Sequence, residues 1–450
     1  MLLVTLAARL AVLAWSWGKF PAAADGHYYD VLADRLARGL GYTWAWPDGA
    51  VTYAAHYPVG YPAALSVAYQ ALGRGPVAAQ LLNTITGTAA SVAGYAVARD
   101  AIGPRAAVVA ACVAALEPAL LLYQPAVMTE AFTAHLLVMA AFAVVQARRA
   151  TGRPQLGWWL GLGLTLGFAT LVRPQSLLFA PAFGALAVSG TAWRRGVAAL
   201  VVSATTLLTC APWTARNCVR MKQCSLVSVN GGWNLLIGAS PASQGHWAPV
   251  EVPDACKTVF DEAKKDSCFG EAARAEIARE PARWLALAPK KLAATFDYAG
   301  AAPWYLHESN PGAFTWRTKE ITAVVETIVH RLILVAALVG LARMSGPRAR
   351  LRWAVAALCV LVALSGIVTH DQHGAWVSHL GVVALALLLG ARALSGPPLI
   401  PLTATAIALT ALVHAVFFGA GRYALPAFPF VALTSFAAFA ARPIRSKEPP

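Results

Sequence analysis

Charged side chains are scarce in this chain of 450 residues: Asp, Glu, Lys and Arg make up only 13% of it, whereas 58% of its residues are hydrophobic. Soluble domains are typically about 25% charged and roughly 45–50% apolar. The shortage of charge excludes a disordered chain, which has the opposite composition. It also argues against a soluble enzyme, because one core cannot bury so many apolar side chains. The composition indicates an integral membrane protein, whose apolar side chains face lipid.

Nucleotide-binding motifs are also missing. The chain has no GxxxxGK[ST] sequence and no glycine-rich loop after a predicted strand. Gly161 and Gly163 lie inside a predicted helix, where small residues allow close helix packing. Such loops hold the phosphates of soluble nucleotides, so a soluble nucleotide is not the expected donor if the protein transfers a group.

Long apolar runs separated by arginines predict about twelve membrane-spanning helices of about 20 residues each. The expected spans cover residues 2–18, 76–98, 105–123, 127–147, 156–172, 175–191, 196–214, 322–343, 352–369, 374–392, 398–417 and 423–441. The first run could instead be a signal peptide cleaved at Ala22–Ala24. Its one basic residue, Arg9, lies within the apolar stretch rather than before it, which favours a span.

The arginines predict the orientation of the spans, because short cytoplasmic loops collect Lys and Arg. With a cytoplasmic N-terminus, all basic loops fall inside, at 99–105, 148–153, 194–195, 343–352 and 392, as does the tail 442–447. Counting the apolar segment Val59–Gly73 as a span would invert every later loop, so we expect an interfacial or re-entrant helix there. The net charge of 36 − 21 = +15 is then mainly a topology signal and no sign of nucleic-acid binding.

Two outer segments are too long to be simple connectors. We expect a transmembrane region over 1–214 that includes a first outer loop at 19–75, a periplasmic loop domain over 215–321, and a C-terminal transmembrane region over 322–450. Acidic and basic residues nearly balance in the periplasmic segment, where 261–280 and 281–297 read as helices. The expected fold class is therefore an all-α polytopic membrane protein with a mostly helical periplasmic insert.

Four of the seven cysteines, Cys218, Cys224, Cys256 and Cys268, lie in this periplasmic segment. An even number of cysteines in an oxidising compartment predicts disulfides. Four cysteines allow three pairings, of which the local one joins Cys218 to Cys224 and Cys256 to Cys268. A zinc site would need tighter spacing.

The first outer loop carries the first candidate catalytic acids. Asp25 directly follows the first span, and the apolar positions of 28–40 follow a helical period, which predicts an amphipathic helix on the membrane surface. A carboxylate this close to hydrocarbon is costly unless it is used or paired. Asp25 could instead be a helix N-cap. Asp30 lies further along the same helix.

Two further charged residues are expected at the outer ends of spans. Glu130, the third candidate catalytic acid after Asp25 and Asp30, begins one of them, where an acid also favours the helix dipole. Arg422 begins the last, and its planar fork suits a phosphate, although it could simply be an anchor that reaches the headgroups. His370, Asp371 and His373 resemble metal ligands, but we expect them to form a polar hairpin between two spans. The other candidate substrate-binding residues are His56, Tyr57, Arg216, Asn230, Asn234, His414 and Tyr423.

Together these segments resemble the GT-C membrane glycosyltransferases, most closely the branch with the dolichyl-phosphate-mannose protein mannosyltransferases, the aminoarabinose transferase of lipid A and the rhizobial lipopolysaccharide galacturonosyltransferases. The resemblance rests on an ordered set of segments: the acidic first loop with Tyr29 and the turn at 39–42, His56–Pro62, Met128–Glu130, Arg173–Pro174, Pro212–Asn217, Asn230–Pro241 and Gly421–Pro429.

The resemblance implies a polyprenyl-phosphate sugar as donor, an acceptor in the cell envelope, a bacterial inner-membrane location and Asp25 as catalyst. Two positions depart from the family pattern. Gly26 replaces a common second acid, for which Asp30 could compensate, and His56-Tyr57-Pro58 replaces a Lys-Pro-Pro turn. No cofactor is required by this interpretation, and a divalent metal ion is left open.

A lipid phosphate is already a good leaving group, so such a transfer needs a base for the acceptor hydroxyl and positive charge for the phosphate. One catalytic carboxylate predicts single displacement with inversion, because retaining enzymes more usually pair two close carboxylates. Two alternatives remain open. A lipid-linked oligosaccharide transporter would show internal repeats and midplane charges, and an O-antigen ligase or polymerase is the other enzyme class.

Overall fold

The structure is a computed structural model that describes residues 1–368 and 374–437. The candidate metal ligands at 370, 371 and 373 and the basic tail at 442–447 lie outside the described residues.

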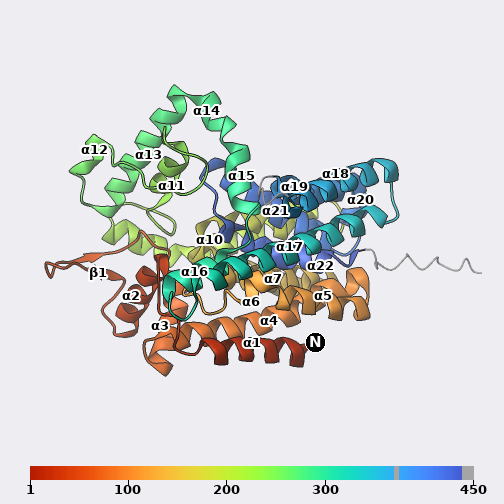
Figure 1. The fold of residues 1–450 in the computed structure, drawn as a ribbon, viewed down its shortest axis with the longest axis horizontal. Coiled ribbons are helices and arrows are strands. Elements are labelled where there is room, and N and C mark those ends of the chain that lie inside the picture. Colours follow the sequence, from red (N-terminus) through yellow and green to blue (C-terminus); the bar gives the residue numbers. More distant parts are fainter. Residues whose placement is uncertain (369–373, 438–450) are drawn as a thin grey trace, which may run out of the picture.

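Long helices form the body of the molecule and run side by side along its long axis (Figure 1). They are α1 (Leu2–Ser16), α4 (Pro76–Ile102), α5 (Pro104–Leu116), α7 (Thr129–Arg149), α8 (Gly152–Val172), α10 (Ala192–Arg220), α17 (Trp316–Arg343), α18 (Ala349–Val368), α19 (Ala375–Leu389) and α21 (Leu399–Val416). In the described part of the chain, five helices are long and apolar enough to cross a membrane: α7, α8, α10, α17 and α21.

Helical structure occurs within all twelve expected spans, but two of those predictions are wrong in length. The run at 175–191 folds as a 3-10 helix, η1 (Pro174–Leu178), and the 8-residue α9 (Phe179–Leu186). The run at 423–441 begins as η2 (Gly421–Ala427), followed by the 7-residue α22 (Phe428–Thr434). At about 1.5 Å per residue, neither α9 nor α22 is long enough by itself to cross about 30 Å of hydrocarbon. Both segments contain prolines, at Pro174 and Pro181 and at Pro426 and Pro429. Most of their apolar residues are buried in the helix bundle, although Leu178 is exposed.

The expected span at 105–123 is also divided, because Pro118 separates α5 from the short α6 (Pro118–Leu121). Proline favours the first turn of a helix, since its missing N–H is not needed there. Glu117, between the two helices, is buried.

The first outer loop consists of α2 (Asp25–Ala37), β1 (Thr43–Ala45), β2 (Val51–Tyr53) and α3 (Gly60–Leu72). The all-α prediction is wrong here, because β1 and β2 pair antiparallel, with Thr43 opposite Tyr53. The turn between them contains Asp48, whose side chain accepts a bond from the Ala50 amide at 3.0 Å, as aspartate often does in turns. α2 is amphipathic as expected and buries Tyr29, Leu32 and Ala33.

The segment after α10 contains α11 (Gly231–Ala239), α12 (Asp254–Lys257), α13 (Glu262–Arg279), α14 (Pro281–Ala286), α15 (Ala288–Phe296) and α16 (Ala301–Ser309). Disulfides join Cys218 to Cys224 and Cys256 to Cys268, which is the local one of the three pairings. The helix expected at 281–297 is interrupted at Leu287, so α14 and α15 are separate. α11 and α13 share a small apolar core, whereas α15 and α16 contribute to the core of the bundle.

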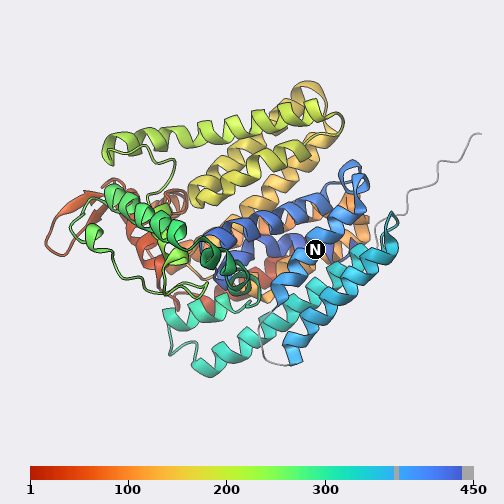
Figure 2. The same cartoon turned by 90° about the horizontal axis from the view of Figure 1, so that it is seen from above.

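The two ends of the bundle differ in character. The first outer loop and α11–α13 gather at one end, on the left of Figures 1 and 2, and the N-terminus lies away from them. Several basic residues meet elsewhere: Arg149 pairs with Asp100, and Arg148 donates to Ser189 and to the Leu394 carbonyl. These contacts bring together the basic ends of α4 and α7, the loop before α10, and the short helix α20 (Ala391–Ser395). The orientation that the arginines predict remains a prediction.

Candidate active site

Four charged side chains from distant parts of the chain meet beneath the first outer loop. Asp25 is the first residue of α2, and Glu130 lies in the first turn of α7. Arg173 is the C-cap of α8, and Arg422 lies in η2. Each stands at the end of a helix or in a short 3-10 segment, so the side chains converge where the helices stop.

The four charges alternate in sign. Nη2 of Arg422 donates to Oδ2 of Asp25 at 2.7 Å, and Nε of Arg422 lies 3.5 Å from Oε1 of Glu130. Nη1 of Arg173 donates to the same oxygen of Glu130 at 2.7 Å. The order is therefore Asp25–Arg422–Glu130–Arg173, with a formal net charge of zero. Buried charges are tolerated when they are paired and hydrogen-bonded in this way.

Burial separates the two acids. The side chain of Glu130 is 2% exposed, whereas that of Asp25 is 35% exposed. Glu130 also accepts a bond from the Tyr123 hydroxyl at 3.3 Å, and Arg173 donates to Thr129 at 3.0 Å. Glu130 is thus fully engaged inside the protein. Asp25 is the one of these two carboxylates that is open to solvent.

Aromatic rings frame the cluster. The Tyr57 hydroxyl donates to Oδ1 of Asp25 at 3.3 Å. The guanidinium carbons of Arg173 and Arg422 lie 5.1 and 5.2 Å from the centre of the Tyr423 ring, which is within cation–π range. His414 stacks on Tyr423 at 4.4 Å between ring centres. Tyr57, His414 and Tyr423, all expected site residues, thus contact the cluster or lie against it.

Gly26 is required by the packing at the start of α2. A Cβ atom at this position would lie 2.6 Å from the carbonyl oxygen of Val127 and 2.9 Å from the hydroxyl of Tyr305. That hydroxyl accepts bonds from the amides of Ala23, at 3.2 Å, and Val127, at 3.1 Å. No side chain fits beside Asp25, so the missing second acid has a steric cause. The interpretation of Asp25 as an N-cap is wrong, because Ala24 is the N-cap and the Asp25 carboxylate faces Arg422.

The structure does not bring Asp30 to this cluster. Its carboxylate accepts a bond from the Tyr69 hydroxyl and pairs with Arg74, both contributed by the chain in and just after α3. Burial, reinforced by the bond to Asp30, raises the pKa of Tyr69 well above its usual value, which keeps this hydroxyl a donor. Asp30 therefore fastens α2 to α3 and does not take the place of the acid missing at Gly26.

The remaining expected residues lie around the outer loops. The amides of Ala55 and His56 donate to Glu262 of α13, at 2.7 and 3.1 Å. Burial lowers the pKa of His56 below 6.5, so its ring is neutral at pH 7. Arg216 donates to the carbonyls of Ala54 and Tyr42, each at 2.9 Å, and so fixes the loop to α10.

Asn230 and Asn234 stand at the start of α11. Asn230 is the N-cap residue and accepts a bond from Ser228 at 2.9 Å, and Asn234 follows one helical turn later. Within residues 1–368 and 374–437, the site contacts described above for Asp25 and Glu130 involve neither asparagine. Their role in substrate binding therefore remains a prediction.

The insert also positions the segment that leads to Arg422. The Gly419 amide donates to the Gly245 carbonyl at 2.8 Å, and Nζ of Lys291 donates to the Val416 carbonyl at 2.9 Å. A Cβ atom at Gly419 would lie 2.1 Å from the Lys291 carbonyl oxygen, so the two segments approach as closely as glycine permits. The segment 215–321 thus helps the helix bundle to position the chain that leads to Arg422.

Arg173 and Tyr123 are the site residues that sequence reasoning missed. Arg173-Pro174 formed part of the resemblance, but Arg173 was not expected to be a site residue. The location of Arg173 could have identified it. On the predicted topology it is a basic residue on the outer side, and the positive-inside rule does not explain an arginine there. No group of three or more His, Cys, Asp or Glu side chains in residues 1–368 and 374–437 is arranged to hold a metal ion.

Comparison with known proteins gives a partial family match. Residues 56–215 match the family model described as dolichyl-phosphate-mannose-protein mannosyltransferase. This range contains Glu130 and Arg173 and excludes Asp25 and Arg422. No curated protein sequence matches the chain.

Solved structures extend the likeness over nearly the whole chain. One is the archaeal oligosaccharyltransferase AglB from Archaeoglobus fulgidus in complex with an inhibitory peptide and a dolichol-phosphate (TM-score 0.50, 14% identity, 97% of this chain and 49% of that chain). Another structure of the Archaeoglobus fulgidus oligosaccharyltransferase, tethered to an acceptor peptide, gives TM-score 0.50 and 16% identity over 97% of this chain and 48% of that chain. ArnT from Cupriavidus metallidurans, bound to undecaprenyl phosphate, gives TM-score 0.42 and 13% identity over 97% and 77% of the two chains.

The oligosaccharyltransferase matches show the fold. The chain shares the fold of the corresponding part of the Archaeoglobus fulgidus oligosaccharyltransferase. It spans about half the length of the archaeal chain in each of these two structures.

Proposed function

We propose that this protein is an integral membrane glycosyltransferase that moves a sugar from a polyprenyl-phosphate donor to an extracytoplasmic acceptor. The observation that carries the proposal is the alternating chain Asp25–Arg422–Glu130–Arg173, which opens to solvent at its Asp25 end. The partial family match and the shared fold support the same class of reaction. One of the oligosaccharyltransferase structures contains a dolichol-phosphate, which supports a lipid phosphate as the leaving group here.

Arg422 connects the two halves of the proposed reaction. Its guanidinium already contacts a carboxylate oxygen, and the oxygens of a phosphate offer the same bidentate geometry. When the donor phosphate occupies this arginine, the Asp25 carboxylate loses its ionic partner and becomes available to the acceptor. Donor binding and activation of the base are therefore coupled through one side chain.

The proposed step is a single displacement. The acceptor oxygen forms a bond to the anomeric carbon while the bond from that carbon to the phosphate oxygen breaks. The acceptor proton passes to Asp25, and the departing phosphate keeps the electron pair and is stabilised by Arg422. The sugar is transferred with inversion at the anomeric carbon.

Glu130 and Arg173 act as positioning residues in this account. Oε1 of Glu130 faces both guanidiniums, so it fixes the distance between them. The Glu130 side chain is too deeply buried to meet an acceptor. We expect its loss to misplace Arg422 and to release a buried, unpaired Arg173, which is costly in a low-dielectric interior.

The acceptor approaches from the side of the first outer loop in this proposal. Tyr57, which donates to Asp25, stacks on Tyr28 at 4.8 Å between ring centres, and Tyr28 is exposed. We place the protein in a bacterial inner membrane, with this loop on the periplasmic side and both termini in the cytoplasm. The separation of the basic loops from the outer loops supports that orientation.

Lipid profiling tests the proposal even while the sugar is unidentified. A strain lacking the protein should accumulate a polyprenyl-phosphate sugar, and the wild-type gene should remove it. The gene encoding Asp25→Asn should leave the accumulation in place although the protein is present in the membrane. Unchanged lipid-linked sugars in the deletion strain, combined with an unchanged envelope glycan, would contradict the proposed activity.

A further inference from the structure

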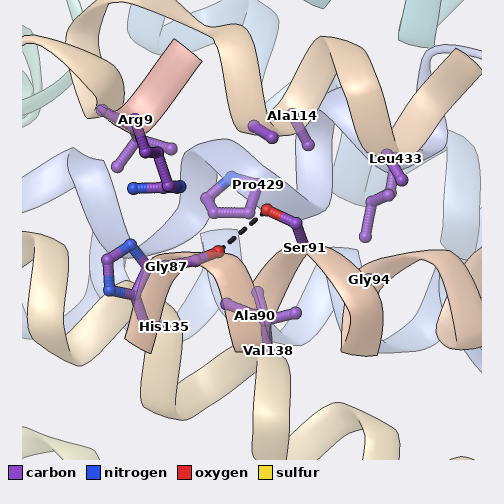
Figure 3. A pocket seen from close by; sticks show the side chains of 13 residues that line it. Arg9, Gly87, Ala90, Ser91, Gly94, Ala114, His135, Val138, Pro429 and Leu433 are labelled. Atoms are coloured by element: carbon purple, nitrogen blue, oxygen red, sulfur yellow. Dashed lines mark hydrogen bonds between the residues drawn. The ribbon is translucent and has the colours of Figure 1, made fainter. Parts of the chain in front are cut away.

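Two buried basic residues, Arg9 and Lys291, differ in whether they can lose their charge. Arg9 of α1 is 3% exposed, and Figure 3 shows its side chain at a cavity lined by small residues such as Gly87 and Ala90. Its guanidinium cannot be deprotonated in a protein. Lys291 of α15 is 0% exposed and is the one buried lysine in the described part of the chain. Burial can remove the proton of a lysine.

Lys291 binds the end of the helix that leads to the candidate active site. Its Nζ donates to the carbonyl of Val416, the last residue of α21, at 2.9 Å. Carbonyls in the last turn of a helix have no partner within the helix and carry partial negative charge. An ammonium ion therefore suits this position. The centre of the Trp284 ring lies 5.0 Å from Nζ, within cation–π range.

A short segment, residues 417–421, joins this contact to Arg422. The insert packs directly on the segment, because a Cβ atom at Gly238 of α11 would overlap the Phe417 carbonyl oxygen. Further along, Gly419 is bonded to the insert as described above. With five tightly packed residues between them, a displacement of Val416 is passed on to Arg422.

The helices packed against α15 contain no carboxylate among their described residues. Their charged or titratable groups, with that of the nearby segment 238–246, are Arg283 of α14, His379 of α19, His414 of α21, Arg422 and Tyr423 of η2, and His246. Asp297, at the end of α15, accepts bonds from the amides of Gly374 and Trp376. Burial, with a further contribution from Arg283, lowers the pKa of Lys291 to about 8. The amine is therefore charged at pH 7 and largely neutral at pH 9.

We propose that Lys291 is a positioning residue for Arg422 and that it acts only in its charged form. The ammonium ion holds the end of α21 and, through residues 417–421, the guanidinium beside Asp25. Loss of the proton leaves the side chain in place but reduces its bond to Val416 to the strength of a neutral hydrogen bond. The consequence for catalysis, weaker binding of the donor phosphate at alkaline pH, rests on the proposed function.

The global stability of the protein changes in the opposite direction. Between a pH of about 8 and the ordinary lysine value of 10.5, the unfolded chain keeps a proton on Lys291 that the folded chain has lost. Because the unfolded state binds more protons in this range, the contribution of Lys291 to stability rises with pH. A local loosening of residues 417–421 at pH 9 can therefore be told apart from unfolding.

Hydrogen exchange tests the positioning without an assay of activity. The amides of Phe417 and Gly419 donate to the carbonyls of Val413 and Gly245, at 3.0 and 2.8 Å, and are the reporters. Purified protein in detergent is labelled at pH 7, 8 and 9, and each rate is divided by the intrinsic rate at that pH. Between pH 7 and 9 the protection of both amides should fall roughly fivefold to tenfold, the difference between a charged and a neutral hydrogen bond.

Two lysine variants make the comparison specific. In Lys291→Arg the protection should stay constant from pH 7 to 9, because the guanidinium keeps its charge. Lys290→Arg changes the exposed neighbour and should behave like the wild type. Constant protection of the two amides in the wild-type protein would overturn the proposal even if Lys291→Arg does not fold, and so would an equal loss of protection in Lys291→Arg.

Donor turnover tests the consequence for catalysis. The kcat/KM for release of polyprenyl phosphate should fall by a similar factor around pH 8 in the wild type and in Lys290→Arg, and this step should be missing in Lys291→Arg. The same step in Lys291→Arg would overturn the link between Lys291 and donor binding. A pH-dependent loss of protection in a protein that releases no polyprenyl phosphate at any pH would support the positioning and contradict the proposed function.

Discussion

Arg422→Lys is the substitution that separates a phosphate-binding arginine from a membrane anchor. Arg422 uses two different nitrogens for its two carboxylates, Nη2 for Asp25 and Nε for Glu130. Lysine has one nitrogen and cannot hold both contacts in the same geometry. As an anchor, however, lysine would serve equally well.

The structure sets the size of the expected loss. The Arg422 side chain is 20% exposed, so its bonds are partly shielded from water. One lost hydrogen bond between charged groups costs about 1.5–3 kcal/mol, which corresponds to a roughly tenfold to hundredfold lower kcat/KM. The assay measures release of polyprenyl phosphate from the lipid-linked donor by purified protein in proteoliposomes.

Arg74→Lys is the matched control. Arg74 also pairs with an aspartate of α2, Asp30, but its side chain is 47% exposed and lies away from the cluster. Exposed ion pairs contribute little, so this variant should keep nearly all activity. If Arg422→Lys reaches the membrane in normal amounts and turns over the donor at the wild-type rate, the reasoning on Arg422 is refuted.

Three further outcomes follow from the same geometry. Gly26→Ala should destabilise the protein by about 1–3 kcal/mol or displace α2, as overpacking does, and a normal melting temperature with full activity would contradict the steric argument. Replacing both Cys256 and Cys268 by serine should cost about 2–4 kcal/mol of stability, and in the wild-type protein all four cysteines of the insert should react with an alkylating reagent only after reduction. Because the pKa of folded His56 lies below 6.5, the folded state binds fewer protons than the unfolded state between these two values, so stability should fall on acidification below pH 6.5. His56→Gln should flatten this part of the thermal-stability profile, and an unchanged slope would show that other groups cause it.

Most of the helices could be predicted from the sequence because their apolar runs are long and bounded by arginines, prolines and glycines. The exceptions at 175–191 and 423–441 have a common reason. Hydropathy reports that a segment avoids water, whether lipid or protein surrounds it, so buried short helices resemble spans. The hairpin of β1 and β2 was missed because its strands are only three residues long.

The acids and Arg422 could be predicted as candidates because a charge at the edge of an apolar run needs an explanation. The contact between them could not be predicted, since Asp25 and Arg422 are 397 residues apart in the chain. Asp30 illustrates the same limit. Its position on α2 suggests that it acts together with Asp25, yet its carboxylate is bonded to Tyr69 and paired with Arg74 instead. The role of Gly26 likewise depends on Val127 and Tyr305, which only the folded chain brings near.

The central claim is that Asp25 is the base of a sugar transfer from a lipid phosphate, and one measurement tests it most directly. Purified wild-type, Asp25→Asn and Asp30→Asn proteins are compared in proteoliposomes with the lipid-linked donor that the deletion strain accumulates and with its acceptor. We expect that Asp25→Asn folds and still binds the donor but transfers no sugar, while Asp30→Asn remains active. Full transfer by Asp25→Asn would contradict the claim, and loss of transfer in Asp30→Asn alone would assign the base to Asp30.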